Sequence, residues 1–181
     1  GVEVHMLQPA HGWVPWWQSK VYPMADHYAW WKSYYGVEIP KMAIQEYIRN
    51  GGDPFKVFID RCKQDNIVPF ISMRMNDGHH LENVENKNNT TGPHAICKFY
   101  AEHPEYRIGP NLKSWDDHVQ NWAIPEVREY KYKYIKEICE IYDIAGFEMD
   151  FMRHPNLFQV DKTTSEQRKQ IMTDFVKSIR K

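Results

Sequence analysis

Three segments of the chain alternate apolar and polar positions with a period of two, which is typical of β-strands with two different faces. They cover residues 2–8, 67–77 and 144–152. In the last two segments one face is apolar, and the other face carries polar groups at Arg74, Asn76, Glu148 and Asp150. The pattern therefore predicts three strands, two of which place charged groups on one side.

Apolar residues that recur every three to four positions predict three amphipathic helices. Asp53 followed by Pro54 is a favourable helix start, with an N-cap side chain before a proline at the first helical position. A second helix is predicted from Pro125, and a third over residues 165–181. Because each helix has one apolar stripe, each should pack against the rest of the chain on one face only.

The order strand then helix, repeated three times, predicts an α/β fold with a parallel sheet. Turns from helix to strand are short, whereas about 45 to 50 residues separate each of the first two strands from the next helix of this pattern. Long connections over one end of a sheet are typical of the active-site face of a (β/α)8 barrel. A doubly wound sheet shares the element order, but its central strands are apolar on both faces. We therefore expect the N-terminal part of a TIM (β/α)8 barrel, about three βα units with long βα loops.

In this interpretation residues 1–181 form a single partial barrel domain, a fragment of a longer chain, because a barrel takes eight strands. Both long loops should lie over the same end of the sheet. The last strand should expose an unpaired edge. We expect that edge to pair with the remaining barrel segments of the parent chain or with a second copy of this chain.

Composition limits the partners. The 23 Lys and Arg residues offset 24 Asp and Glu residues, and no basic run stands out, so nucleic acid is not expected. No stretch approaches the roughly 20 apolar residues of a bilayer span, so no membrane partner is expected. The three cysteines are widely spaced and give no disulfide framework. Aromatic residues make up 14% of the chain, and many lie between the predicted elements, where large rings usually contact something.

Five segments carry a family resemblance: GWVPWWQSKVYP, GGDPFKVFIDRC, PFISMRMNDGHH, NWAIPEVREY and YDIAGFEMDFMRHP. They resemble the glycosyl-hydrolase-like barrels of bacteria, a group related in fold to the α-amylase and α-galactosidase enzymes. The most specific pieces are RMND followed by HH, and G-x-E-x-D-F-x-R-H-P. The second resembles the strand that carries a catalytic aspartate in those enzymes, which implies a glycoside hydrolase with Asp150 as nucleophile. A parent protein of that kind is expected to be secreted or periplasmic.

Glu148 and Asp150 are the candidate catalytic residues. They lie two positions apart on one strand and point to the same side, with Asp150 nearer the carboxyl end, where barrel chemistry takes place. Arg74 shares that face by parity and is expected to pair with Glu148, and Arg153 is expected at the rim. The alternative is a structural ion-pair network. No other acid follows a predicted strand convincingly, so we expect the fragment to be inactive alone.

The predicted partner is an oligo- or polysaccharide, bound by polar groups after the strands and by tryptophan rings. The candidate substrate-binding residues are Arg74, Asn76, Asp77, His79, His80, Trp13, Trp16, Trp17, Trp115, Arg153 and His154. The histidine loop suits zinc by residue type but matches no standard ligand spacing, so neither a metal nor another cofactor is expected. Two alternatives remain, a carbohydrate-binding barrel without turnover and a metal-dependent hydrolase that uses the histidine loop.

Overall fold

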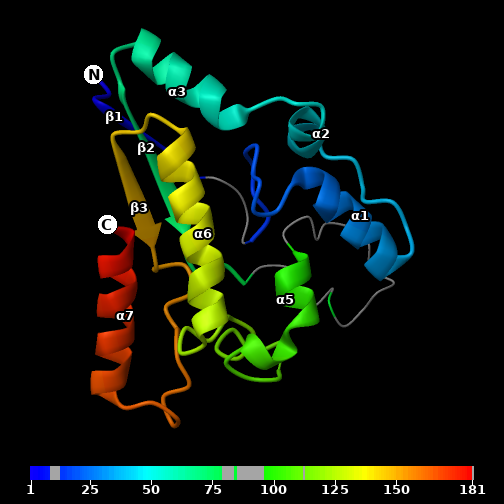
Figure 1. Ribbon diagram of the computed structural model, residues 1–181, viewed down its shortest axis with the longest axis vertical. Helices are drawn as coiled ribbons and strands as arrows, with labels where there is room; N and C mark the ends of the chain where they lie inside the picture. Colours follow the sequence, from blue (N-terminus) through cyan, green and yellow to red (C-terminus); the bar gives the residue numbers. More distant parts are fainter. Residues whose placement is uncertain (9–12, 79–83, 85–95, 112, 181) are drawn as a thin grey trace.

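The computed structural model describes residues 1–8, 13–78, 84, 96–111 and 113–180. It is an α/β structure, as the sequence predicts, with an open three-stranded parallel sheet and helices packed beside it (Figure 1). In chain order the elements are β1 (Val4–Leu7), α1 (Met24–Tyr35), α2 (Ala43–Arg49), α3 (Pro54–Gln64), β2 (Val68–Arg74), α5 (Lys98–Glu102), the 3-10 helix η1 (Pro104–Tyr106), α6 (Pro125–Ile141), β3 (Gly146–Asp150) and α7 (Ser165–Ile179).

The strands run parallel in the order β1-β2-β3, so that β2 is central. In the register, Ser72 lies opposite Glu148, and Arg74 lies opposite Asp150. Because side chains alternate between the two faces of a strand, these four residues share one face of the sheet. The predicted placement of Arg74, Glu148 and Asp150 on one side is therefore confirmed.

The two faces of the sheet differ in what covers them. One face packs into the core, where Ile71 and Met73 of β2 are buried. The other face, called the open face below, consists of Val4, Met6, Val68, Phe70, Ser72, Arg74, Glu148 and Asp150. At the starts of the strands, this face carries apolar side chains that are between 40% and 47% exposed, those of Val4, Met6 and Val68. The open face therefore changes from apolar to charged along the direction of the strands.

Local sequence explains where the helices begin. Asp53 accepts hydrogen bonds from two backbone N–H groups in the first turn of α3, and Pro54 is the first residue of that helix, as predicted. Pro125 likewise begins α6. Thr164 and Gln167 form a capping box at the start of α7, in which each side chain accepts a hydrogen bond from the backbone of the other residue.

The long connections contain helices that the sequence pattern does not predict. Helices α1 and α2 lie between β1 and α3, and α5 lies between β2 and α6. Helix α1 is buried around much of its circumference, at Met24, His27, Tyr28, Trp30, Trp31 and Tyr35. Its rings pack on one another, with 4.2 Å between the ring centroids of Trp31 and Tyr35. Much of the aromatic content therefore belongs to the core. Within the described ranges, no helix is both long and apolar enough to cross a bilayer.

A buried glutamate connects the first long loop with α6. The carboxylate of Glu137 accepts hydrogen bonds from the indole of Trp17 at 2.8 Å and the hydroxyl of Ser19 at 2.7 Å. It also accepts bonds from the backbone N–H groups of Lys20 at 2.5 Å and Val21 at 3.3 Å. Because these donors solvate the buried charge, the loop after β1 has a fixed position on α6.

Candidate functional site

Asp150 ends β3 on the open face, opposite Arg74 of β2. Its Oδ1 atom accepts a hydrogen bond from the backbone N–H of Met152 at 2.8 Å, which orients the carboxylate. Glu148 is exposed and accepts a hydrogen bond from the hydroxyl of Ser72 at 3.1 Å. The two carboxylates lie on the same strand and face, separated by roughly 7 Å of strand rise.

Arg74 pairs with Asp77. The pairing with Glu148 that the sequence predicts is therefore wrong. The Nη1 atom of Arg74 lies 3.1 Å from Oδ2 of Asp77, whose side chain is fully buried. The other carboxylate oxygen of Asp77 lies 3.9 Å from Nε2 of His154, and the backbone carbonyl accepts a hydrogen bond from the indole of Trp13 at 3.2 Å. Asp77 therefore joins the loops that follow all three strands, and the two long loops meet at one end of the sheet as predicted.

Asn76 also connects the second and third of these loops. Its side-chain amide donates hydrogen bonds to the backbone carbonyls of Gln120 at 3.2 Å and Asn156 at 2.9 Å. Its Oδ1 atom accepts a hydrogen bond from the backbone N–H of Gln120 at 3.1 Å. Because the buried amide of Asn76 is used within the protein, its role here is to hold the loops together. This differs from the expected contact with substrate.

The predicted tryptophans fall into two groups. Trp13 and Trp17 are each only 2% exposed and belong to the core, so neither presents a face to a pyranose ring, contrary to expectation. Trp16 is partly buried and packs against the same core. Trp115 is 58% exposed, and its ring stacks on that of His154, with 5.1 Å between centroids and 15° between planes. Of these four, Trp115 is the residue with a large exposed surface.

The remaining predicted polar residues separate in the same way. Arg153 is exposed, whereas the next residue, His154, is buried and contacts Asp77 and Trp115. His79 and His80 lie outside the described residues. Among the described residues, no group of three or more His, Cys, Asp or Glu side chains has the arrangement of a metal site.

Lys131 is a buried neighbour of this region that the predicted site does not include. Its ammonium donates a hydrogen bond to the backbone carbonyl of Arg74 at 3.2 Å and lies 4.0 Å from the ring centroid of Trp13. Burial lowers the pKa of Lys131 to about 7, and the nearby charge of Asp77 acts in the opposite direction. A signal for it exists in the sequence, because Lys131 occupies the apolar stripe of α6 between Val127 and Tyr134.

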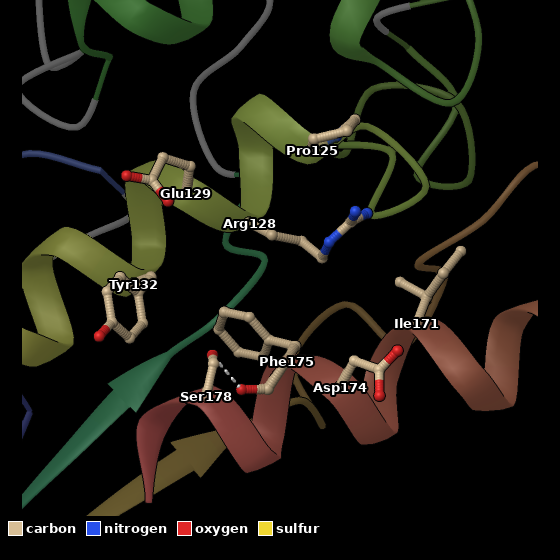
Figure 2. A pocket seen from close by; sticks show the side chains of 8 residues that line it. All are labelled: Pro125, Arg128, Glu129, Tyr132, Ile171, Asp174, Phe175 and Ser178. Carbon is tan, nitrogen blue, oxygen red and sulfur yellow. Dashed lines mark hydrogen bonds between the residues drawn. The ribbon is translucent and has the colours of Figure 1, made fainter. Parts of the chain in front are cut away.

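Two surface grooves are relevant to the location of a site. One, of about 380 Å³, lies between α6 and α7 and is lined by Arg128, Tyr132, Ile171 and Phe175 among others (Figure 2). It contains none of the predicted site residues. A second groove, of about 440 Å³, lies between residues 108–117 and 156–162, in the loops after β2 and β3. The second groove is the one that adjoins the predicted site in sequence.

Comparison with known proteins adds no assignment, because no family model and no curated protein matches the chain.

Proposed function

We propose that this chain is part of a TIM-barrel glycoside hydrolase in which Asp150 is the nucleophile. The observation that carries the proposal is the position of Asp150 at the carboxyl end of β3, opposite Arg74 on the open face. In parallel α/β barrels, the groups that carry out the chemistry lie at the carboxyl ends of the strands.

Two further observations support a sugar as the substrate. The open face is charged at the strand ends, while Trp115 on a loop after β2 has most of its surface in solvent. An exposed indole beside polar groups suits a sugar, which has apolar ring faces and a rim of hydroxyls. The sequence likeness to glycosyl-hydrolase-like barrels favours the same substrate class.

The proposed chemistry follows from the hydrogen bond at Asp150. Because the backbone N–H of Met152 holds Oδ1, the other oxygen, Oδ2, is the one that forms a bond to the anomeric carbon. The glycosidic C–O bond breaks as this bond forms, and the leaving oxygen takes a proton from a general acid. Water then hydrolyses the glycosyl ester and releases Asp150. Glu148, which is bound to Ser72, adds negative charge that stabilises the oxocarbenium-like transition state.

A trapping experiment tests the nucleophile without depending on the general acid. In a 2-deoxy-2-fluoroglycosyl fluoride the leaving group is fluoride, which departs without protonation. A panel of these reagents with different sugar configurations is incubated with the protein, and labelled peptides are identified by mass spectrometry. We expect one glycosyl group on the peptide that contains Asp150 and none in Asp150→Asn. Glu148→Gln keeps the nucleophile and should still be labelled on the same peptide, but more slowly, because it loses charge that stabilises the transition state. A label elsewhere, or no label from any reagent, contradicts the assignment.

A further inference from the structure

We infer that Trp115 is the platform of a second sugar subsite, separate from Asp150, which binds an uncharged pyranose ring of an oligosaccharide. The class of ligand rests on the proposed function. The residues and contacts that support the subsite are independent of the catalytic carboxylate, so the two can fail separately.

Trp115 is held in place from below while much of its surface remains in solvent. Its ring is stacked on the buried ring of His154, and it lies 5.2 Å from the ring of His118, which is also buried. A large indole exposed to 58% carries a cost in water, because its apolar surface remains hydrated. A sugar ring stacked on it would remove that surface from water without any rearrangement of the side chain.

The loop that carries Trp115 is held to the loop after β3. Residues 107–109 run antiparallel to residues 117–120, with a bridge between Arg107 and Gln120. Asp116 accepts a hydrogen bond from the side-chain amide of Asn156, and the side chain of Gln159 donates to the backbone carbonyl of Ile108. Because these contacts already order both loops, binding does not have to offset the entropy of ordering them.

A groove lined by the two residues that follow Trp115 in the chain, Asp116 and Asp117, indicates the charge of the ligand. Its lining includes the carboxylates of Asp116, Asp117 and Asp161 and one ammonium, that of Lys162. Carboxylates accept hydrogen bonds from sugar hydroxyls but repel uronic acids and sulfated sugars. The volume of about 440 Å³ lies within the usual range for small-ligand sites. The subsite is therefore suited to a neutral ring.

A series of contacts connects this subsite with the nucleophile. Trp115 stacks on His154, His154 approaches Asp77, and Asp77 pairs with Arg74, which lies opposite Asp150 in the sheet. A sugar bound at Trp115 is thus held by loops that are fixed to the strand ends. An oligosaccharide that occupies both positions would gain affinity from the outer ring and place an inner bond near Asp150.

The test measures binding of neutral oligosaccharides by two-dimensional ¹H–¹⁵N NMR and by calorimetry. The probes are gluco-, xylo-, manno- and chito-oligosaccharides, with oligogalacturonates as the charged comparison. We expect the indole N–H signal of Trp115 to shift with at least one neutral probe. Trp115→Ala should weaken binding about tenfold or more, and Trp115→Phe should weaken it less, because a smaller ring still stacks. Tyr47→Ala, which removes an exposed ring on α2, should have no effect.

The outcomes separate the two proposals. Binding that is unchanged in Trp115→Ala, or oligogalacturonates that bind as tightly as neutral probes, overturns the subsite and leaves the role of Asp150 standing. Trp115-dependent binding together with no label on Asp150 supports the subsite and overturns the nucleophile. If none of the neutral probes binds the folded chain, the subsite is wrong, while the role of Asp150 is still decided by the labelling experiment. Retention of the wild-type NMR dispersion in Trp115→Ala excludes unfolding as the cause of lost binding.

Discussion

Lys131 is buried at a position where a lysine would be expected to reach solvent. A lysine in the apolar stripe of α6 would ordinarily extend to solvent, but this side chain is fully buried beneath the strand ends. Its ammonium has the carbonyl of Arg74 and the face of Trp13 as neighbours, and these compensate only part of the lost hydration. The fold therefore holds a cation-forming group at the base of the proposed site, with a pKa lowered by burial to about 7.

This gives a pH dependence of stability with a definite sign. Unfolding returns Lys131 to its ordinary pKa of 10.5, so between about pH 7 and that value the unfolded chain binds more protons than the folded one. The free energy of unfolding should therefore rise with pH from about 7, by at most about 1.4 kcal/mol per pH unit. Urea denaturation at pH 6.5 to 8.5 measures this rise. In Lys131→Met, which keeps the aliphatic packing, the free energy of unfolding should rise less over the same range.

The measurement is limited to pH 8.5 because the ionisation of other groups changes the free energy of unfolding at higher pH. Burial raises the pKa of Cys97 to about 11, so ionisation of that thiol in the unfolded chain lowers stability once the pH passes its ordinary value of 9.0. Below pH 8.5 the difference between the wild type and Lys131→Met isolates the lysine. Parallel stability profiles for the two proteins would show that Lys131 keeps its charge on folding.

At the scale of elements, the strands and the helices with one apolar stripe were predictable from the sequence. Proline and aspartate punctuation set the starts of α3 and α6, and period-two alternation set β2 and β3. Helix α1 was not predictable in this way, because aromatic burial around much of its surface removes the contrast between two faces. The periodicity of apolar residues arises from the contrast between a buried and an exposed face. A helix that is buried on most sides lacks this contrast and is therefore difficult to predict from the sequence.

For the candidate site, the sequence predicts only on which face of the sheet the residues lie. Parity places Arg74 and Asp150 on one side of the sheet, but it does not choose a partner for the guanidinium. Arg74 instead pairs with Asp77, three positions along the chain, because the backbone turns directly after β2. The burial of Trp13 and Trp17 could not be predicted either, since it depends on how the first long loop packs on α6.

That packing yields a prediction about Glu137. Glu137→Ala leaves the buried indole of Trp17 and the hydroxyl of Ser19 without their acceptor, along with two backbone N–H groups. We expect a loss of about 3 kcal/mol in the free energy of unfolding, measured by urea denaturation. Glu140→Ala, in an exposed ion pair on the same helix, is the matched control and should cost less than about 1 kcal/mol. Similar losses in the two variants would mean that Glu137 is not what holds the first loop.

At the scale of the whole molecule, the described sheet forms one wall of the proposed site. The strands present Arg74, Glu148 and Asp150 on the open face, and the loops above them carry Trp115 and the acidic groove. In the described strands, both carboxylates of this face belong to β3 and so lie on the same side of any bound sugar. Glycosidases place their two carboxyl groups on either side of the bond that is cleaved. The described strands therefore carry the proposed nucleophile, and among them none places a second carboxyl group across the bond from it.

The last prediction concerns which substrates this chain alone can turn over. A glycosyl fluoride needs only the nucleophile, because fluoride leaves without a proton, whereas an alkyl glycoside needs a general acid positioned at the leaving oxygen. We expect purified residues 1–181 to release fluoride from a suitable glycosyl fluoride in an Asp150-dependent manner, and to hydrolyse the alkyl glycoside of the same sugar at or near the uncatalysed rate. Fluoride release is followed with an ion-selective electrode and alkyl glycoside hydrolysis by chromatography, with Asp150→Asn as the comparison for each. Rapid hydrolysis of the alkyl glycoside, abolished by Asp150→Asn, would contradict this prediction. It would mean that a general acid already lies within reach of Asp150 in this chain, in addition to the carboxylates on the open face.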